Sequence, residues 1–227
     1  MSAKMVYLQP IPVRVWHWLN ALGIITLCVS GAQIRFPEYV SVLGSYRTAI
    51  TLHNTAGIVV ALSFSIWFFY YKIVANKLEE IYIPKKSDLT TGLFRQMVFY
   101  FFSYFFGAPN PHHATPENKF NPLQKSAYLA IMFVLMPIVS LTGILLMNMG
   151  PMREIVLFIG GLKILVVLHF LTACSLTAFI FTHVYLATLG SKPMSYIKPM
   201  WTGWEKVEDH HDTQSNHVGN TGHSVSP

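Results

Sequence analysis

The stretch LKILVVLHFLTACSLTAFIFTHVYLATL, residues 162–189, decides the fold class. Apart from Lys163 near its start it carries no acidic or basic residue, and a membrane crossing takes about 20 mostly apolar residues of helix. It also contains two histidines, His169 and His183. An ionisable side chain inside a membrane helix is costly and therefore indicates a function. The stretch predicts a membrane-spanning helix with a chemical role.

The overall composition places the chain among integral membrane proteins. Hydrophobic residues make up 52% of it and charged residues 11%, whereas roughly a quarter of a soluble domain is charged. Three further segments, residues 15–34, 50–71 and 124–147, meet the same length criterion. Pro137 lies within the third of these segments, and we expect it to bend that helix. The predicted fold class is an all-α integral membrane protein with a four-helix transmembrane bundle.

Four histidines lie inside the predicted helices, and their depths form two pairs. Successive helices run in opposite directions, so His17 lies near the inner end of the first helix and His53 near the outer end of the second. His169 lies near the outer end of the fourth helix and His183 near its inner end. The predicted pairs are therefore His17 with His183 and His53 with His169.

The spacing on the fourth helix indicates what the pairs could bind. His169 and His183 are fourteen residues apart, which is about 21 Å of helix and close to four whole turns, so they share one face. Haem b takes two axial ligands from opposite sides, and imidazoles on facing helices of a bundle supply them. We predict two haems b stacked across the membrane. Interhelical hydrogen bonding is the alternative for a single membrane histidine, but it does not explain two pairs at matched depths.

Small residues in or beside the same helices favour close approach of backbone to a flat ring. His53 is followed one turn later by Gly57. This pair of residues is the better of several weak indications of close approach. Ordinary helix packing is the alternative for each glycine. The glycines concerned are Gly23, Gly31, Gly57 and Gly143.

Charge and cysteine usage exclude several other classes of protein. The predicted helices contain no Asp or Glu, which argues against a proton pump or ion transporter. The formal charge of +6 comes from scattered residues that form no patch, so nucleic-acid binding is not expected. Two cysteines without a C-x-x-C-H motif exclude covalently attached haem.

The distribution of Lys and Arg predicts the orientation in the membrane. With the N-terminus inside, twelve of the sixteen basic residues lie on the inner side, so we expect both termini in the cytoplasm. The inner loop contains LFRQMVFYFFSYFF, residues 93–106, which is too short to span and is expected to form a short interfacial helix. A cap over the end of the bundle is an alternative compatible with it.

The remainder of the chain gives little chemistry. Helical periodicity is lost from Trp201 onward, so we place the transmembrane di-haem domain at residues 1–206 and a disordered tail at 207–227. A further six histidines lie in the tail or in the inner loop, where we expect solvated segments rather than metal sites. They are His112, His113, His210, His211, His217 and His223.

Several motifs together resemble a known family of membrane cytochrome b subunits. The resemblance is to the subunit of thiosulfate reductase and, more distantly, to the gamma subunit of formate dehydrogenase and the b-type cytochrome of nickel-iron hydrogenases. It covers about residues 10 to 206, and its most specific parts are the R-x-x-H-W around His17 and the fourteen-residue histidine pair. The stretches are PVRVWHWLNALG (12–23), HNTAG (53–57), NPLQKSAYLAIM (121–132), HVYLA (183–187) and GWE (203–205).

The resemblance implies the same histidine pairs as the depth argument, and it adds two further sites. It implies a quinone site beside the inner haem, where Asn121 and Gln124 offer amide groups; capping of the third helix is an equal alternative. Arg14 is expected to pair with a propionate of the inner haem, with an interfacial anchor as the alternative.

The expected function is that of a membrane electron-transfer subunit of a respiratory oxidoreductase complex. Two haems b would connect menaquinone or ubiquinone at the inner side with an iron-sulfur or multihaem partner at the outer face. Substrate catalysis is expected in that partner. The expected location of this chain is the inner (cytoplasmic) membrane of a bacterium. The alternatives are a self-contained transmembrane haem reductase for a soluble acceptor and a haem-free membrane anchor.

Overall fold

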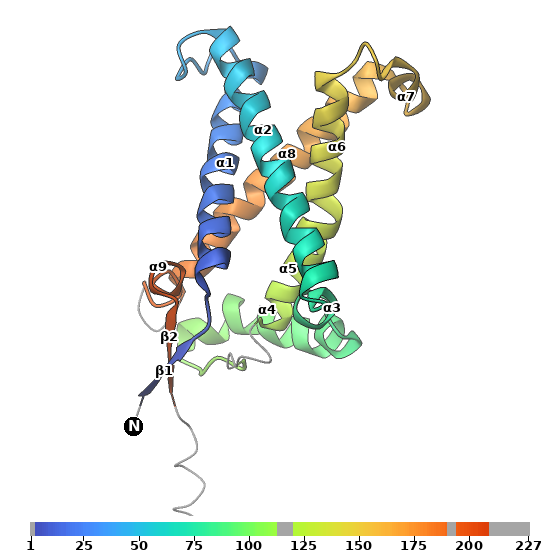
Figure 1. Cartoon of the computed structure of the whole chain (residues 1–227). Coiled ribbons are helices and arrows are strands. Elements are labelled where there is room, and N and C mark those ends of the chain that lie inside the picture. The colour runs from blue at the N-terminus through green and yellow to red at the C-terminus, as the bar shows by residue number, and fades with distance from the viewer. Residues whose placement is uncertain (1–2, 113–119, 190–193, 209–227) are drawn as a thin grey trace, which may run out of the picture.

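The computed structural model describes residues 3–112, 120–189 and 194–208, and in this part of the chain four helices are long and apolar enough to cross a membrane (Figure 1). Each begins and ends within four residues of its predicted bounds, and the chain is a multi-pass membrane protein. The helical spans are Ile11–Arg35, Tyr46–Val74, Pro122–Met147 and Gly161–Thr188.

Two of the spans are single α-helices and two contain π-helical turns. The first is α1 (Ile11–Arg35) and the fourth is α8 (Gly161–Thr188). The second is α2 (Tyr46–Phe69) continued by a π-helical turn, Tyr70–Val74. The Ser45 hydroxyl caps α2 by accepting the Thr48 N–H at 3.0 Å, which satisfies one of the first backbone donors of the helix.

The third span is divided at the predicted proline. It consists of α5 (Pro122–Ala130), a π-helical turn (Ile131–Leu135) and α6 (Met136–Met147). Pro137 has no backbone N–H and its ring would clash with a carbonyl in the preceding turn of a regular helix. The wider π-helical turn directly before Pro137 relieves that clash, so the irregularity has a local cause.

The four spans are organised as two helix pairs. Helix α1 packs along α2, α6 packs along α8, and α2 meets α6, whereas among the described residues α8 is not closely packed against α1 or α2. Figure 1 shows α8 crossing obliquely behind the other helices, from the end near α6 and α7 (Arg153–Phe158) to the end near α9 (Pro199–Thr202). One end of α8 therefore lies near the start of α1.

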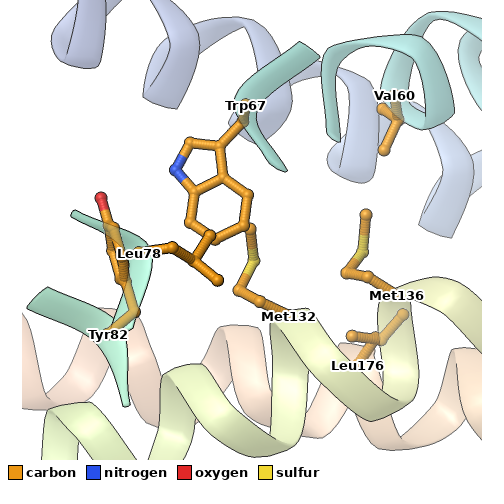
Figure 2. Packing of buried hydrophobic residues seen from close by; sticks show 7 residues of the cluster. All are labelled: Val60, Trp67, Leu78, Tyr82, Met132, Met136 and Leu176. Atoms are coloured by element: carbon orange, nitrogen blue, oxygen red, sulfur yellow. The ribbon is translucent and has the colours of Figure 1, made fainter. Parts of the chain in front are cut away.

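The buried apolar core is concentrated in the half of the bundle that contains the start of α1, which the basic residues predict to face inside and which is called the inner half. Trp67 of α2 is 5% exposed and lies edge-on to Tyr82 of α3 (Leu78–Tyr82), with ring centroids 4.9 Å apart. Figure 2 shows Met132 of the third span beside the Trp67 ring, whereas Met136 lies nearer Val60 and Leu176. The cluster thus joins α2, α3, the third span and α8. Its members are Val60, Trp67, Leu78, Tyr82, Met132, Met136 and Leu176.

Polar contacts and a close glycine contact hold α1 against α2. The Asn20 amide donates to the Ser63 hydroxyl at 2.8 Å, and the Trp16 indole N–H donates to the Ser63 carbonyl at 3.1 Å. One turn further along α1, a Cβ added at Gly23 would lie 2.5 Å from a methyl group of Val60. The absence of a side chain at Gly23 is therefore required for the observed packing.

We expect Gly23→Ala to lower the free energy of unfolding by about 1–3 kcal/mol, because the added methyl overpacks the interface between α1 and α2. The change is measured as the thermal loss of helical circular dichroism in detergent. The double variant Gly23→Ala/Val60→Ala should recover part of the loss. Gly57→Ala is the matched control, because its nearest contact is 3.9 Å away. Equal effects at Gly23 and Gly57 would contradict this packing.

The short helix expected in the inner loop is present, and its place in the membrane interface stays a prediction. It comprises α4 (Leu93–Phe101) followed by a 3-10 turn, Ser103–Phe106, and Figure 1 shows α4 lying across the end of the bundle. Its outer face exposes aromatic rings such as Phe101 at 71% and Phe106 at 88%. Gln96, only 1% exposed, faces inward.

Buried polar groups attach the inner loop to the third span. Lys125 forms an ion pair with Asp88 at 3.5 Å, and Asp88 begins the π-helical turn Asp88–Gly92 that precedes α4. Burial raises the pKa of the Tyr100 hydroxyl, which is hydrogen-bonded by the amides of Gln96, Asn110 and Asn121. The inner loop therefore packs over the end of the bundle as well as lying across it.

The two ends of the described chain pair in a way that the sequence did not predict. Strand β1 (Ala3–Tyr7) pairs antiparallel with β2 (Trp204–Glu208), with Tyr7 opposite Trp204. The expectation of disorder from Trp201 onward, with a tail beginning at residue 207, was therefore wrong up to Glu208. A non-local partner, not local periodicity, orders this segment. Residues 209–227 lie outside the described part.

Candidate functional site

The first pair of histidines lies at the inner end of the bundle. His17 projects from the second turn of α1 and His183 from the last turns of α8, and their ring centroids are 6.3 Å apart. The edge of Trp18 meets the His17 ring, and Phe179 stacks on the His183 ring at 5.7 Å. The Nδ1 atom of His17 is buried and has no hydrogen-bond partner among the described residues.

The second pair lies toward the other end of the same helix. His53 of α2 and His169 of α8 also have ring centroids 6.3 Å apart, with their planes inclined by 72°. The structure thus brings together the residues that the depth argument paired. Their roles as ligands stay a prediction, because the pairing alone does not identify a bound group.

Hydroxyl groups contact both rings of the outer pair. Ser30 Oγ lies 3.0 Å from Nδ1 of His53, and Thr142 Oγ1 lies 2.9 Å from Nδ1 of His169. Ser30 is fully buried on α1 and Thr142 is 5% exposed on α6. The sequence analysis missed both residues, although each directly precedes a glycine that it had singled out. A hydroxyl residue followed by glycine occurs at matching depth in two spans, as Ser30–Gly31 and Thr142–Gly143. This repeated dipeptide could have identified the two hydroxyl partners.

Those glycines, Gly31 and Gly143, lie against the same two rings. A Cβ at Gly31 would be 3.2 Å from Cε1 of His53, and a Cβ at Gly143 would be 3.3 Å from Cε1 of His169. Gly57, the residue that seemed the better signal, has only Leu27 near it at 3.9 Å. Each outer ring is therefore held by a neighbouring hydroxyl-glycine dipeptide, Ser30–Gly31 or Thr142–Gly143.

The spacing of the rings fits a metal ion bound between each pair. A metal–imidazole bond of about 2 Å, with the ring centre about 1 Å behind the nitrogen, places two coaxial rings about 6 Å apart. The measured separation of 6.3 Å in both pairs agrees with this value. In the described residues no group of three or more His, Cys, Asp or Glu could hold a metal ion, so these are two-ligand sites, as haem iron requires.

Arg14, expected at a haem propionate, lies one turn before His17. Its guanidinium donates one hydrogen bond to the carbonyl of Trp201 in α9. The Nε atom is buried and has no hydrogen-bond partner among the described residues. Arg14 thus connects α1 to α9 beside the inner pair and keeps a donor that fits an anionic group; its role at a propionate or as an interfacial anchor stays a prediction.

Asn121 and Gln124 form a capping box at the start of α5. Oδ1 of Asn121 accepts the Gln124 N–H at 2.8 Å, and Oε1 of Gln124 accepts the Asn121 N–H at 2.9 Å. The capping interpretation of these residues is therefore correct. The Nε2 donor of Gln124 has no partner among the described residues, whereas the Asn121 amide also bonds Tyr100. Only Gln124 keeps a donor for another molecule.

The other histidines lie apart from the two pairs or outside the described residues. His112 belongs to the inner loop, where its backbone N–H donates to Asn110. His113 and the tail residues His210, His211, His217 and His223 lie outside the described part.

A four-helix membrane protein with two stacked pairs of facing imidazoles defines the class of b-type membrane cytochromes. Comparison of the sequence with known families agrees. Residues 8–203 match the prokaryotic cytochrome b561 family, and the chain belongs to it. Membership implies b-type haem as the cofactor.

Individual relatives include subunits of two kinds of oxidoreductase. The putative cytochrome YdhU of Escherichia coli K12 is 31% identical over 203 residues, covering 88% of this chain and 75% of the relative. A probable Ni/Fe-hydrogenase B-type cytochrome subunit of Rhodobacter capsulatus is 26% identical over 80% of this chain and 73% of the relative. The formate dehydrogenase cytochrome b556(fdo) subunit of Escherichia coli K12 is 36% identical over 63 residues, 26% of this chain and 30% of the relative.

These comparisons confirm the resemblance to the membrane cytochromes b of hydrogenase and formate dehydrogenase. The chain is a membrane cytochrome b related to those electron-transfer subunits. None of the three names mentions thiosulfate reductase, so the assignment to that branch stays a prediction.

Proposed function

We propose that this chain carries electrons across the inner (cytoplasmic) membrane of a bacterium through two haems b, between a quinone site at the inner side and a redox partner at the outer face. The observation that supports this most strongly is the repeated geometry of the histidines. Two pairs on α1, α2 and α8 have the same ring separation, 6.3 Å, near opposite ends of the bundle. His17 and His183 would hold the inner haem, and His53 and His169 the outer one.

The loose packing of α8 against α1 and α2 supports the same proposal. Each pair joins α8 to one of these helices, and neither interface is closely packed among the described residues. A flat macrocycle between facing helices needs such a separation. When bound, haem supplies one-electron redox chemistry at its iron, and the histidines hold and orient it. Arg14 would offer its Nε donor to a propionate.

The quinone site is proposed at the inner end, beside the first turn of α5. The Gln124 side chain is exposed there and its Nε2 donor is unpaired among the described residues. A quinone carbonyl is an acceptor that this donor suits, for either menaquinone or ubiquinone. Asn121 would position Gln124 through the capping box rather than contact the quinone.

A partner subunit is proposed because the relatives are named as subunits of hydrogenase and formate dehydrogenase. An iron-sulfur or multihaem protein at the outer face would exchange electrons with the outer haem. The basic residues favour both termini on the cytoplasmic side, which is the side of the paired strands and of α4 (Figure 1).

The test is a haem count followed by reduction with a quinol. We expect two haems b per chain from the pyridine haemochrome of protein purified in mild detergent, and reduction of haem by a short-chain quinol. Gln124→Glu keeps the capping acceptor but removes the Nε2 donor, and it should slow quinol-driven reduction about fivefold, the value of one hydrogen bond. Dithionite reduction is the control and should not change.

Different outcomes separate the parts of the proposal. One haem per chain, or none, would overturn the di-haem arrangement. Two haems with quinol kinetics unchanged in Gln124→Glu would move the quinone site elsewhere. Rapid reduction of a soluble ferric chelate by the isolated chain would favour the self-contained reductase instead.

A further inference from the structure

The two histidine pairs differ in their hydrogen bonding. Both outer rings have a hydroxyl group at Nδ1, within 3.0 Å for His53 and 2.9 Å for His169. At the inner pair, Nδ1 of His17 is buried without a partner among the described residues. The same residues also provide no hydrogen bond to the ring of His183. Two otherwise equivalent sites are therefore chemically unequal.

The direction of the hydrogen bonds at His53 follows from the proton of the serine. Ser30 Oγ donates to the carbonyl of Thr26 at 2.6 Å, so toward the ring it acts as an acceptor. His53 is therefore protonated at Nδ1, and its Nε2 keeps the lone pair that binds iron.

The same arrangement recurs at the opposite helix. Thr142 Oγ1 donates to the carbonyl of Ile138 at 2.7 Å and accepts from Nδ1 of His169. The carbonyl of Val139 accepts a second, longer hydrogen bond from Thr142 Oγ1 at 3.1 Å. In both outer ligands the ring Nδ1–H thus donates to a hydroxyl group, and that hydroxyl donates to a backbone carbonyl of its own helix.

We propose that Ser30 and Thr142 are positioning residues that make the outer haem the lower-potential member of the pair. The inference rests on the proposed function, since it assumes haem between the histidines. An imidazole whose N–H is donated is a more basic ligand, and a more basic ligand stabilises ferric over ferrous iron. Hydrogen bonding of an axial ligand is one of the means by which a protein sets haem potential. Among the described residues, neither inner ring has such a hydrogen bond.

The difference gives electron transfer a preferred direction, from the outer side to the inner side. With haem bound, His53 and His169 would hold the iron that gives up one electron, and His17 and His183 would hold the iron that takes it up. The iron-sulfur or multihaem partner would supply the next electron to the outer site. Two such electrons, with two protons taken from the inner side, convert one quinone to one quinol.

The experiment is a potentiometric titration of the purified holoprotein, followed in the α-band. In the wild type we expect the outer haem, recognised as the component lost in His53→Ala, to have the lower midpoint potential. The double variant Ser30→Ala/Thr142→Val should shift its one-electron reduction equilibrium about tenfold toward the ferrous form, which is 59 mV. Each single variant should shift less, because the hydroxyl contact at the other ring remains.

Matched controls separate tuning from structure. Thr142→Ser keeps the hydroxyl and should keep the wild-type potential. Ser65→Ala and Thr177→Val remove hydroxyls that bond only to carbonyls of their own helix or to Cys28, away from the four rings, and should leave both potentials unchanged.

An unchanged outer potential in the double variant, with two haems still bound, would overturn the inference. So would loss of the outer haem in that variant, which would show that the hydroxyls hold the ring without tuning it. A wild-type protein with fewer than two haems would instead count against the proposed function, so the two failures are distinguishable.

Discussion

Replacement of one histidine from each pair is expected to remove one haem and leave the other. His53→Ala should reduce the content from two haems b per chain to one, and His183→Ala should do the same at the other site. Each iron loses an axial ligand in a place where no other described His, Cys, Asp or Glu completes a site. The pyridine haemochrome and the reduced-minus-oxidised spectrum measure the content and identify the component lost.

Both variants should also abolish quinol-dependent reduction of an outer acceptor, because the electron-transfer path requires both haems. His112→Ala, in the inner loop, is the control and should keep two haems. His53→Met guards against simple misfolding: thioether sulfur ligates haem iron and raises its potential, so this variant should retain the outer haem at a higher potential. Two full haems in either alanine variant would contradict the assigned ligands.

A bulky residue in place of either glycine beside the outer pair should have a comparable effect. Gly31→Leu and Gly143→Leu each place a side chain where even a Cβ would lie 3.2 or 3.3 Å from a histidine Cε1. The ring must move, and we expect outer-haem affinity to fall at least about tenfold while the inner haem remains. Haem titration of the apoprotein, with the two components resolved spectrally, measures this.

Gly150→Leu is the control for that experiment, since nothing lies within 4 Å of a Cβ at Gly150. It should bind both haems as the wild type does. Loss of the inner haem alone from Gly31→Leu would be incompatible with the placement of Gly31 against His53.

The spans and the histidine pairs could be predicted because they depend on position along the helix axis. A membrane of fixed thickness determines where each helix crosses, and the depth of His17 or His169 then follows from its place in the span. The basic residues add a prediction of which helix ends face inside. Neither step needs knowledge of helix rotation.

The hydroxyl partners and the terminal strands could not be predicted in the same way. Whether Ser30 faces His53 depends on the rotation of α1 about its axis, and spacing alone does not supply this. The pairing of Tyr7 with Trp204 joins residues almost two hundred positions apart, so no local sequence pattern predicts it. For Asn121 and Gln124 the sequence allowed two roles; the structure shows the capping box, and contact of Gln124 with a quinone stays a proposal.

The division of the bundle into two helix pairs has a consequence for assembly. One half, α1 and α2, carries His17 and His53, whereas both remaining ligands are on α8 in the other half. On the proposed ligation each haem is a cross-link between halves that otherwise meet mainly where α2 touches α6. The two hairpins would insert into the bilayer as separate units, meet through the buried core around Trp67, and acquire the final spacing of α8 from α1 and α2 only with the cofactors. Cofactor insertion is then the final step of tertiary folding, not a later addition to a finished protein.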